Sequence, residues 1–355
     1  MRILIAVSTL TPGSGLSRYV ISLCRLLAND YEVCVVTTHS GDDVEFAKRE
    51  LDAISPNIEF IRLGRYPKAI KYLKAIRLLR AEQPLLLINN YNGVFQQILP
   101  FAKQNIRVLH ILHNDAPDFY RIAAINASRV DSWIAPTQAL ADNFNSYTNS
   151  HYSKKVSVIP HGVEEAEYKP RANQCLEIVF TGVVYTHKGA RVLPPVIKEL
   201  RRQGVNLHFT IIGDGILSDW IRGELAQEIA EGIVDVTGIL PHNEVYERMA
   251  KADVFLYPTH VDAFGLVIAE AMMNGAVPVV TLLPGITDNL IDDGVSGFLL
   301  PQDDTEAFVT AIKNLYDNRD ILREASASAY QKAMSRLSFK AMKANYINHI
   351  SNITE

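Results

Sequence analysis

Two acids flanking a glycine are the chemistry-bearing feature that stands out in the sequence. Seven residues separate Asp262 from Glu270, and Phe264-Gly265 lies between them, where a helix is expected to begin. A helix N-terminus offers N–H groups and partial positive charge to a diphosphate, and Gly265 permits close approach of the backbone. The two carboxylates can accept hydrogen bonds from sugar and ribose hydroxyls. The spacing suits a sugar nucleotide, but it also suits a surface loop acid followed by an acid in the first turn of a helix.

A second feature is a run of basic residues with no acid among them. Its members are Arg62, Arg65, Lys68, Lys71, Lys74, Arg77 and Arg80. Apolar residues such as Leu73 and Ile76 alternate with these bases, which indicates an amphipathic basic helix. Such a surface can bind anionic lipid, each base adding about 1 kcal/mol near the membrane. The alternative is a solvated helix face whose apolar side is core. Both interpretations stay open, because bases at every third position spread around a helix and do not mark a single face.

The elements that position these residues follow from apolar runs that alternate with helical patterns, as in parallel βαβ units. The expected strands of the first half are Arg2–Val7, Glu32–Thr37, Ile58–Ile61, Leu85–Ile88, Arg107–Leu112 and Ser132–Ala135. Those of the second half are Glu177–Phe180, Asn206–Ile212, Val234–Val236, Val254–Tyr257 and Val277–Val280. The clearest helices are Leu16–Leu27, Lys68–Leu79, Ala190–Arg202, Asn243–Ala250 and Gly265–Met273.

The two halves of the chain follow one plan. Each opens with a strand and a glycine-bearing turn, with Gly13 and Gly15 in the first and Gly182 and Gly189 in the second. Apolar strands indicate that helices cover both faces of each sheet. We therefore predict an α/β fold of two doubly wound, Rossmann-like parallel-sheet domains facing a central cleft, where ligand sites favour forming. The linker is expected within Val163–Gln174.

Composition excludes several other classes of protein. The chain has 355 residues, 48% of them hydrophobic and 21% charged, which is typical of a folded protein of about two domains. No apolar run approaches the ~20 residues of a membrane-spanning helix, and the apolar N-terminus is typical of a buried first strand rather than a signal peptide. A net charge of −4 disfavours nucleic acid. The odd count of three cysteines, Cys24, Cys34 and Cys175, favours free thiols in a reducing compartment.

Beside these residue-level inferences, the order of motifs between Val158 and Pro301 resembles the retaining GT-B-fold glycosyltransferases of family 4 (glycosyl transferases group 1). The segment from Asp262 to Glu270 is similar to the acid-x7-Glu motif of that family. The other matching segments are, in order, Val158-Ile-Pro-His-Gly-Val163, Phe180-Thr-Gly182, Lys188-Gly189, Gly213-Asp-Gly215, Val236-Thr-Gly, Gly275-Ala-Val-Pro, Pro284-Gly-Ile and Asp293-Gly-Val-Ser-Gly297. Each motif is weak alone, but their number and order are specific.

The resemblance implies roles for the matching residues. Glu270 would hold the ribose hydroxyls, Asp262 the hydroxyls of the donor sugar, and Lys188 the departing phosphate. The other expected donor-binding residues are Phe264, Gly265 and Leu266 through their amides, Gly182 and Gly213 at the glycine turns, and Gly15 across the cleft. His113 matches a position close to the transferred sugar, although a satisfied histidine at a strand end is the alternative. Lys188-Gly189 could likewise be a plain helix start.

Two positions depart from the family pattern. The family usually carries Arg directly after the glycine of Gly182, where this chain has Val183, so a guanidinium that would grip a phosphate is missing. Lys188 or Arg18 would then carry more of the charge. The family also usually has Glu where Asp262 stands, and the shorter arm implies a changed donor geometry.

The resemblance predicts a retaining hexosyl or N-acetylhexosaminyl transferase that uses a nucleotide-diphosphate sugar and a glycan or lipid-linked acceptor in cell-surface polysaccharide assembly. It implies an acceptor-binding domain over 1–165, a donor-binding domain over 170–337, and a C-terminal helix, 338–355, packed back on the first. We expect no metal or other cofactor, and a cytoplasmic protein, peripheral on the inner face of the membrane if the basic segment binds lipid. The alternatives are a catalytically idle nucleotide-sugar-binding subunit, favoured by Val183, and a nucleotide-sugar epimerase of the same fold.

Overall fold

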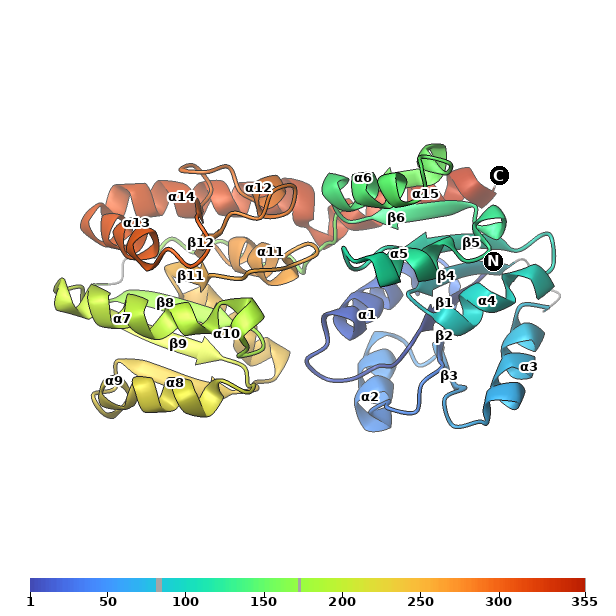
Figure 1. The fold of residues 1–355 in the computed structure, drawn as a ribbon, viewed down its shortest axis with the longest axis horizontal. Helices are drawn as coiled ribbons and strands as arrows, with labels where there is room; N and C mark the ends of the chain where they lie inside the picture. Colours follow the sequence, from blue (N-terminus) through green and yellow to red (C-terminus); the bar gives the residue numbers. More distant parts are fainter. Residues whose placement is uncertain (81–84, 172–173, 355) are drawn as a thin grey trace. The chain divides into compact units, whose positions relative to one another are not determined.

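The computed structural model describes residues 1–80, 85–171 and 174–354. Two residues of the predicted linker, 172 and 173, and the last residue of the predicted C-terminal helix lie outside these ranges. The chain divides into two compact units, one formed by Met1–His161 with Met342–Glu355 and the other by Gly162–Ala341. Figure 1 shows a parallel sheet covered by helices in each unit.

The first unit contains a seven-stranded sheet in the order β3-β2-β1-β4-β5-β6-β7, with all pairs parallel. Its strands are β1 (Arg2–Val7), β2 (Glu32–Thr37), β3 (Glu59–Arg62), β4 (Leu85–Asn90), β5 (Arg107–Ile111), β6 (Ser132–Ala135) and β7 (Val156–Val158). Its helices are α1 (Gly15–Leu27), α2 (Val44–Ile54), α3 (Lys68–Leu78), α4 (Gly93–Ile98), α5 (Pro117–Ala124) and α6 (Gln138–Tyr147), joined by most of α15 (Phe339–Thr354).

The second unit contains a six-stranded parallel sheet in the order β10-β9-β8-β11-β12-β13. Its strands are β8 (Leu176–Thr181), β9 (Leu207–Ile212), β10 (Val234–Gly238), β11 (Val254–Tyr257), β12 (Val277–Thr281) and β13 (Phe298–Leu300). Its helices are α7 (Leu193–Arg202), α8 (Ser218–Glu224), α9 (Ala226–Ala230), α10 (His242–Lys251), α11 (Leu266–Met273), α12 (Thr287–Leu290), α13 (Thr305–Asp317) and α14 (Arg319–Lys332).

The central strands are buried along most of their length because helices cover both faces of each sheet. Every residue of β4 is buried, including the polar Asn89 and Asn90 at its carboxyl end. The helix α11 is also buried over most of its length, so it lies inside the second unit rather than on its surface. All three cysteines are free; Cys24 and Cys34 are buried, and Cys175 is only partly so. The predicted α/β class with two Rossmann-like sheets is confirmed.

The last helix, α15, is tied to the first unit by its apolar side. Met342, Tyr346 and Ile350 recur every four residues and are buried. The hydroxyl of Tyr346 hydrogen-bonds the hydroxyl of Tyr19 on α1, and Lys343 pairs with Asp30 at 2.9 Å. This contact makes Met342–Glu355 part of the first core.

Each sheet reverses its strand order beside its first strand, between β1 and β4 in the first unit and between β8 and β11 in the second. Loops that leave the carboxyl ends of the strands meet outside such a switch point, and ligands bind there in open α/β sheets. The predicted site residues lie mostly in or next to these loops. No helix in the described ranges is both long and apolar enough to span a membrane.

Candidate functional site

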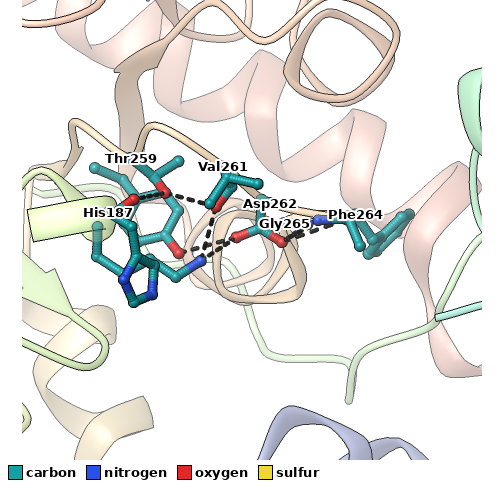
Figure 2. Close-up of polar contacts among 9 residues, drawn as sticks. His187, Thr259, Val261, Asp262, Phe264 and Gly265 are labelled. Atoms are coloured by element: carbon teal, nitrogen blue, oxygen red, sulfur yellow. Dashed lines mark hydrogen bonds and ion pairs between the residues drawn. The ribbon is translucent and has the colours of Figure 1, made fainter. Parts of the chain in front are cut away.

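Asp262 is the centre of a hydrogen-bonded loop between β11 and α11, shown in Figure 2. Its Oδ1 accepts the backbone N–H groups of Ala263, Phe264 and Gly265 at 2.8, 3.3 and 3.0 Å. Its Oδ2 accepts the Tyr257 hydroxyl at 2.9 Å and the Lys188 ammonium at 3.0 Å. The Asp262 side chain is only 18% exposed. The alternative of a plain surface acid is therefore wrong.

Lys188 reaches this loop from a short 3₁₀ turn, Thr186–Lys188, which follows β8. Its ammonium also donates to the Val261 carbonyl at 3.1 Å and lies 5.5 Å from the centre of the Tyr257 ring. Burial alone would raise the pKa of Asp262, but the charge and hydrogen bond of Lys188 outweigh it and the pKa is lowered. Burial, and then the Asp262 charge, raise the pKa of Tyr257, so this hydroxyl stays a donor.

Glycine is required where these turns touch. Gly189 has φ of +67°, and a Cβ there would lie 1.8 Å from the Pro258 carbonyl oxygen. This close backbone contact holds the turn that carries Lys188 against the chain after β11. A Cβ on Gly213, which has φ of +126°, would lie 1.9 Å from the carbonyl oxygen of Gly182. The predicted residues Gly182 and Gly213 are thus in direct contact.

Glu270 lies in the middle of α11 and is buried. The helix has no acid in its first turn, so the alternative of a first-turn acid is wrong. The predicted start of this helix shifts by one residue, because Gly265 adopts φ of +84° and precedes the first helical residue, Leu266. The Nε2 of His242 donates to Glu270 Oε1 at 3.1 Å.

His242 is a site residue that sequence reasoning missed. It begins α10, and its ring packs edge-on against Tyr246 with ring centres 4.3 Å apart. Because it lies 28 positions before Glu270 in the sequence, no local spacing links the two. The one available signal is a titratable residue at a helix start shortly after β10.

The first unit holds the other predicted residues, His113 and Gly15. His113 follows β5, and its Nε2 donates to Asn90 Oδ1 at 3.0 Å. Burial lowers the pKa of His113 to about 3, so the ring is neutral near pH 7. Gly15 is the first residue of α1, is exposed, and would have no heavy atom within 4 Å of an added Cβ.

The structure thus brings Lys188, Asp262, Phe264 and Gly265 together in one cluster, with Leu266 starting the helix behind it. Val183, in the position where the family usually has Arg, is 45% exposed. Within residues 1–80, 85–171 and 174–354, no group of three or more His, Cys, Asp and Glu side chains could hold a metal ion.

Two parallel-sheet units with these glycine turns define the GT-B class of folds. A crystal structure of HepE from Anabaena, containing UDP and glucose, has a TM-score of 0.79 and 17% identity, covering 99% of this chain and 100% of that one. This likeness shows the fold.

Matches to family profiles and to related sequences agree with the GT-B fold. Residues 176–318 match the family described as glycosyl transferases group 1, and residues 13–167 match glycosyltransferase family 4. The chain belongs to these glycosyltransferases. WcaL of Escherichia coli K12, named for colanic acid biosynthesis, is 30% identical over 164 residues, 43% of this chain and 40% of that protein.

A second relative aligns over more of the chain. The O-antigen chain mannosyltransferase C of Escherichia coli is 22% identical over 84% of this chain and 83% of its own length. By contrast, the chain spans less than half the length of the WcaL proteins that it matches.

Proposed function

We propose that this chain is a retaining, metal-independent glycosyltransferase. It moves a hexosyl or N-acetylhexosaminyl group from a nucleotide-diphosphate sugar to a glycan or lipid-linked acceptor in cell-surface polysaccharide assembly. One observation carries the proposal: an ammonium group, Lys188, is held within 3.0 Å of Asp262 beside the start of α11. Family membership supports it, as do the UDP and glucose held by HepE and the names of WcaL and the O-antigen mannosyltransferase.

The diphosphate is proposed to bind where the loop meets α11. There the Lys188 ammonium, which pairs with Asp262 at 3.0 Å, would turn its charge to the diphosphate. The Leu266 amide supplies one of the N–H groups that a helix leaves unpaired at its start. The amides of Phe264 and Gly265 donate to Asp262, so a bound diphosphate competes with this carboxylate for them. Asp262 released in this way can accept hydroxyls of the donor sugar.

The nucleoside is proposed to bind beside Glu270. Because His242 occupies Oε1 of Glu270, the carboxylate is fixed in orientation and its Oε2 can accept a ribose hydroxyl.

In the transfer step, the bond between the anomeric carbon and the diphosphate breaks while the acceptor oxygen bonds to that carbon on the same face. The acceptor hydroxyl gives its proton to the departing phosphate oxygen. The protein therefore works by positioning both substrates and by stabilising negative charge on the diphosphate. From their match to family positions, Gly15 and His113 are proposed to contact the substrates. His113 is neutral and donates its one N–H, on Nε2, to Asn90, so its Nδ1 would accept a hydrogen bond from a substrate hydroxyl.

A panel of UDP-, GDP-, ADP- and dTDP-sugars in a thermal-shift assay tests donor binding, since a bound donor raises the melting temperature. The donor that shifts the protein is then incubated with glycan and lipid-linked acceptors, and the anomeric configuration of the product is read by NMR. A retained configuration supports the proposal. Tight donor binding with no product on any acceptor favours the idle subunit, and an isomerised donor without acceptor favours the epimerase.

The exposed side of α3 supports association with an anionic membrane surface. Leu73 is 67% exposed and Ile70 is 44% exposed, and both lie among exposed bases, including Lys68, Lys74 and Arg77. Apolar side chains ringed by positive charge are suited to the boundary between headgroups and acyl chains. We propose that the protein is cytoplasmic and that this face rests on the membrane that carries a lipid-linked acceptor.

A further inference from the structure

A stacked aromatic pair lies at the carboxyl edge of the first sheet. Tyr91 directly follows β4, and Phe119 is in the first turn of α5; their ring centres are 3.9 Å apart and their planes differ by 21°. Both residues are partly buried and keep some exposed surface. Because β4 borders the switch point beside β1, the pair lies where an open α/β sheet takes its ligands.

The backbone of Tyr91 is unusual for an aromatic residue. Its φ is +52°, in the left-handed region that Gly and Asn adopt at lower cost. The segment is held in place by Asn92, whose side-chain amide donates to the Val7 carbonyl at 2.7 Å and to Thr38 Oγ1 at 2.9 Å. An aromatic side chain in a strained conformation at a sheet edge is the kind of outlier that clusters at functional sites.

Polar groups border the pair. Asp118 and Arg121 on α5 form an exposed ion pair at 3.1 Å. Burial first, and then the Asp118 charge, raise the pKa of Tyr91, which indicates that this carboxylate lies near the phenol. Asn90, next to Tyr91, accepts from His113. Flat aromatic surface beside a carboxylate and a guanidinium matches the two-sided chemistry of a sugar ring, which has C–H faces and hydroxyl edges.

We propose that Tyr91 and Phe119 form a stacking platform for a pyranose ring of the acceptor. The ring's C–H face packs on the aromatic pair, and its hydroxyls bond Asp118 or Arg121. This inference rests on the proposed function, and it adds the acceptor class: the residue that receives the transferred sugar is part of a glycan, or is the first sugar of a lipid-linked one, rather than a bare lipid alcohol.

Saturation-transfer difference NMR tests the platform directly. The probes are methyl α- and β-glycosides of glucose, galactose, mannose and N-acetylglucosamine at millimolar concentration. For at least one of them we expect the ring protons of a single face to receive the strongest saturation in wild type. Tyr91→Ala and Phe119→Ala should each reduce that signal at least fivefold, and Tyr91→Phe should keep most of it because the ring remains.

Phe101→Ala is the matched control, since Phe101 is an exposed aromatic residue of the same unit, 60% exposed, that lies outside the pair. It should leave the signal unchanged. Melting curves show whether each alanine variant folds. Because the two rings are removed in separate variants, the other alanine variant keeps the test valid if one does not fold. Equal signals from wild type, Tyr91→Ala and Phe119→Ala, or no signal from any probe in wild type, overturn the platform.

Failure of the platform is distinguishable from failure of the proposed function. The donor thermal shift is measured on the same wild-type sample, without an acceptor sugar. A donor shift without methyl-glycoside signals removes the platform and leaves the transferase proposal in place. Methyl-glycoside signals that depend on Tyr91, without any donor shift, leave a sugar site and remove the transferase proposal.

Discussion

Lys188 and Asp262 neutralise each other across 3.0 Å in a mostly buried setting, with side chains 17% and 18% exposed. Five donors converge on the Asp262 carboxylate, which has about four lone-pair sites. Its acceptor capacity is therefore fully used inside the protein. A sugar nucleotide that binds here as proposed must displace some of these hydrogen-bond donors from Asp262. The ion pair thus orders the loop.

Replacing Lys188 by alanine should lower kcat by roughly 10²–10³, with a smaller effect on the donor KM, because in the proposed transfer step the ammonium stabilises charge that develops on the leaving diphosphate. Steady-state kinetics with the donor identified by thermal shift measure both constants. Lys198→Ala is the matched control, because Lys198 pairs with Glu224 at 3.2 Å on the exposed surface of the same unit. Unchanged turnover in Lys188→Ala would remove this lysine from the mechanism.

Asp262 should also make stability depend on pH. Its pKa is lowered in the folded protein below the ordinary value of 3.8, so its contribution is present above about pH 4 and is lost as pH falls through the folded pKa. The difference in unfolding free energy between wild type and Asp262→Asn should therefore shrink below pH 4. Urea unfolding from pH 3 to pH 7 measures it. A difference that stays constant over this range would contradict the lowered pKa.

At the scale of elements, the apolar runs identified the strands because both faces of each sheet are covered. β1, β2, β6 and β11 begin and end where predicted. The strands β7 and β13 were not predicted, because each has only three residues and so short a run is too weak a pattern to mark a strand. The helix predicted from Ala190 is instead a 3₁₀ turn, Ala190–Val192, followed by α7. The reason is that two prolines stand at the second and third positions of α7.

The candidate site was predictable only in part. The acids at Asp262 and Glu270 and the glycine turns carry short-range signals, since their spacing and residue types are local. The contacts that define the chemistry are not local: Lys188 meets Asp262 from 74 residues away, and Tyr91, after β4, stacks on Phe119 in α5. These pairings depend on strand order, which a single sequence does not specify.

The exposed face of α3 should bind anionic lipid. Co-sedimentation with phosphatidylglycerol vesicles should exceed that with phosphatidylcholine vesicles. A triple reversal to glutamate at Lys68, Lys74 and Arg77 should abolish the difference, because each base contributes about 1 kcal/mol near a charged surface.

The control for the α3 variant reverses the same number of positive charges at sites outside α3. Arg202, Arg323 and Lys169 lie on the second unit and are 73%, 59% and 77% exposed. Their reversal to glutamate should leave vesicle binding intact. Equal, weak binding to both kinds of vesicle by wild type would show that α3 is an ordinary solvated helix.

At the scale of the whole molecule, a reaction supported by Lys188 and by helix amides should need no divalent cation. Transfer rates should therefore be the same in EDTA and in added Mg²⁺ or Mn²⁺, in protein treated beforehand with chelator. A rate that falls at least tenfold in EDTA and returns with one of these ions would show that a metal takes part. Lys188→Ala rescued by Mg²⁺ would locate that ion beside the diphosphate.

The contact between Tyr19 and Tyr346 joins residues 327 positions apart. It therefore constrains the order in which the two units can complete their folding during synthesis. A ribosome makes Gly162–Ala341 in full before Met342–Glu355 exists, so the second unit can fold while the first still lacks its closing helix. Until Met342–Glu355 has been synthesised, the Tyr19 hydroxyl on α1 lacks its Tyr346 partner, and the apolar side chains around it stay in contact with water or with a chaperone.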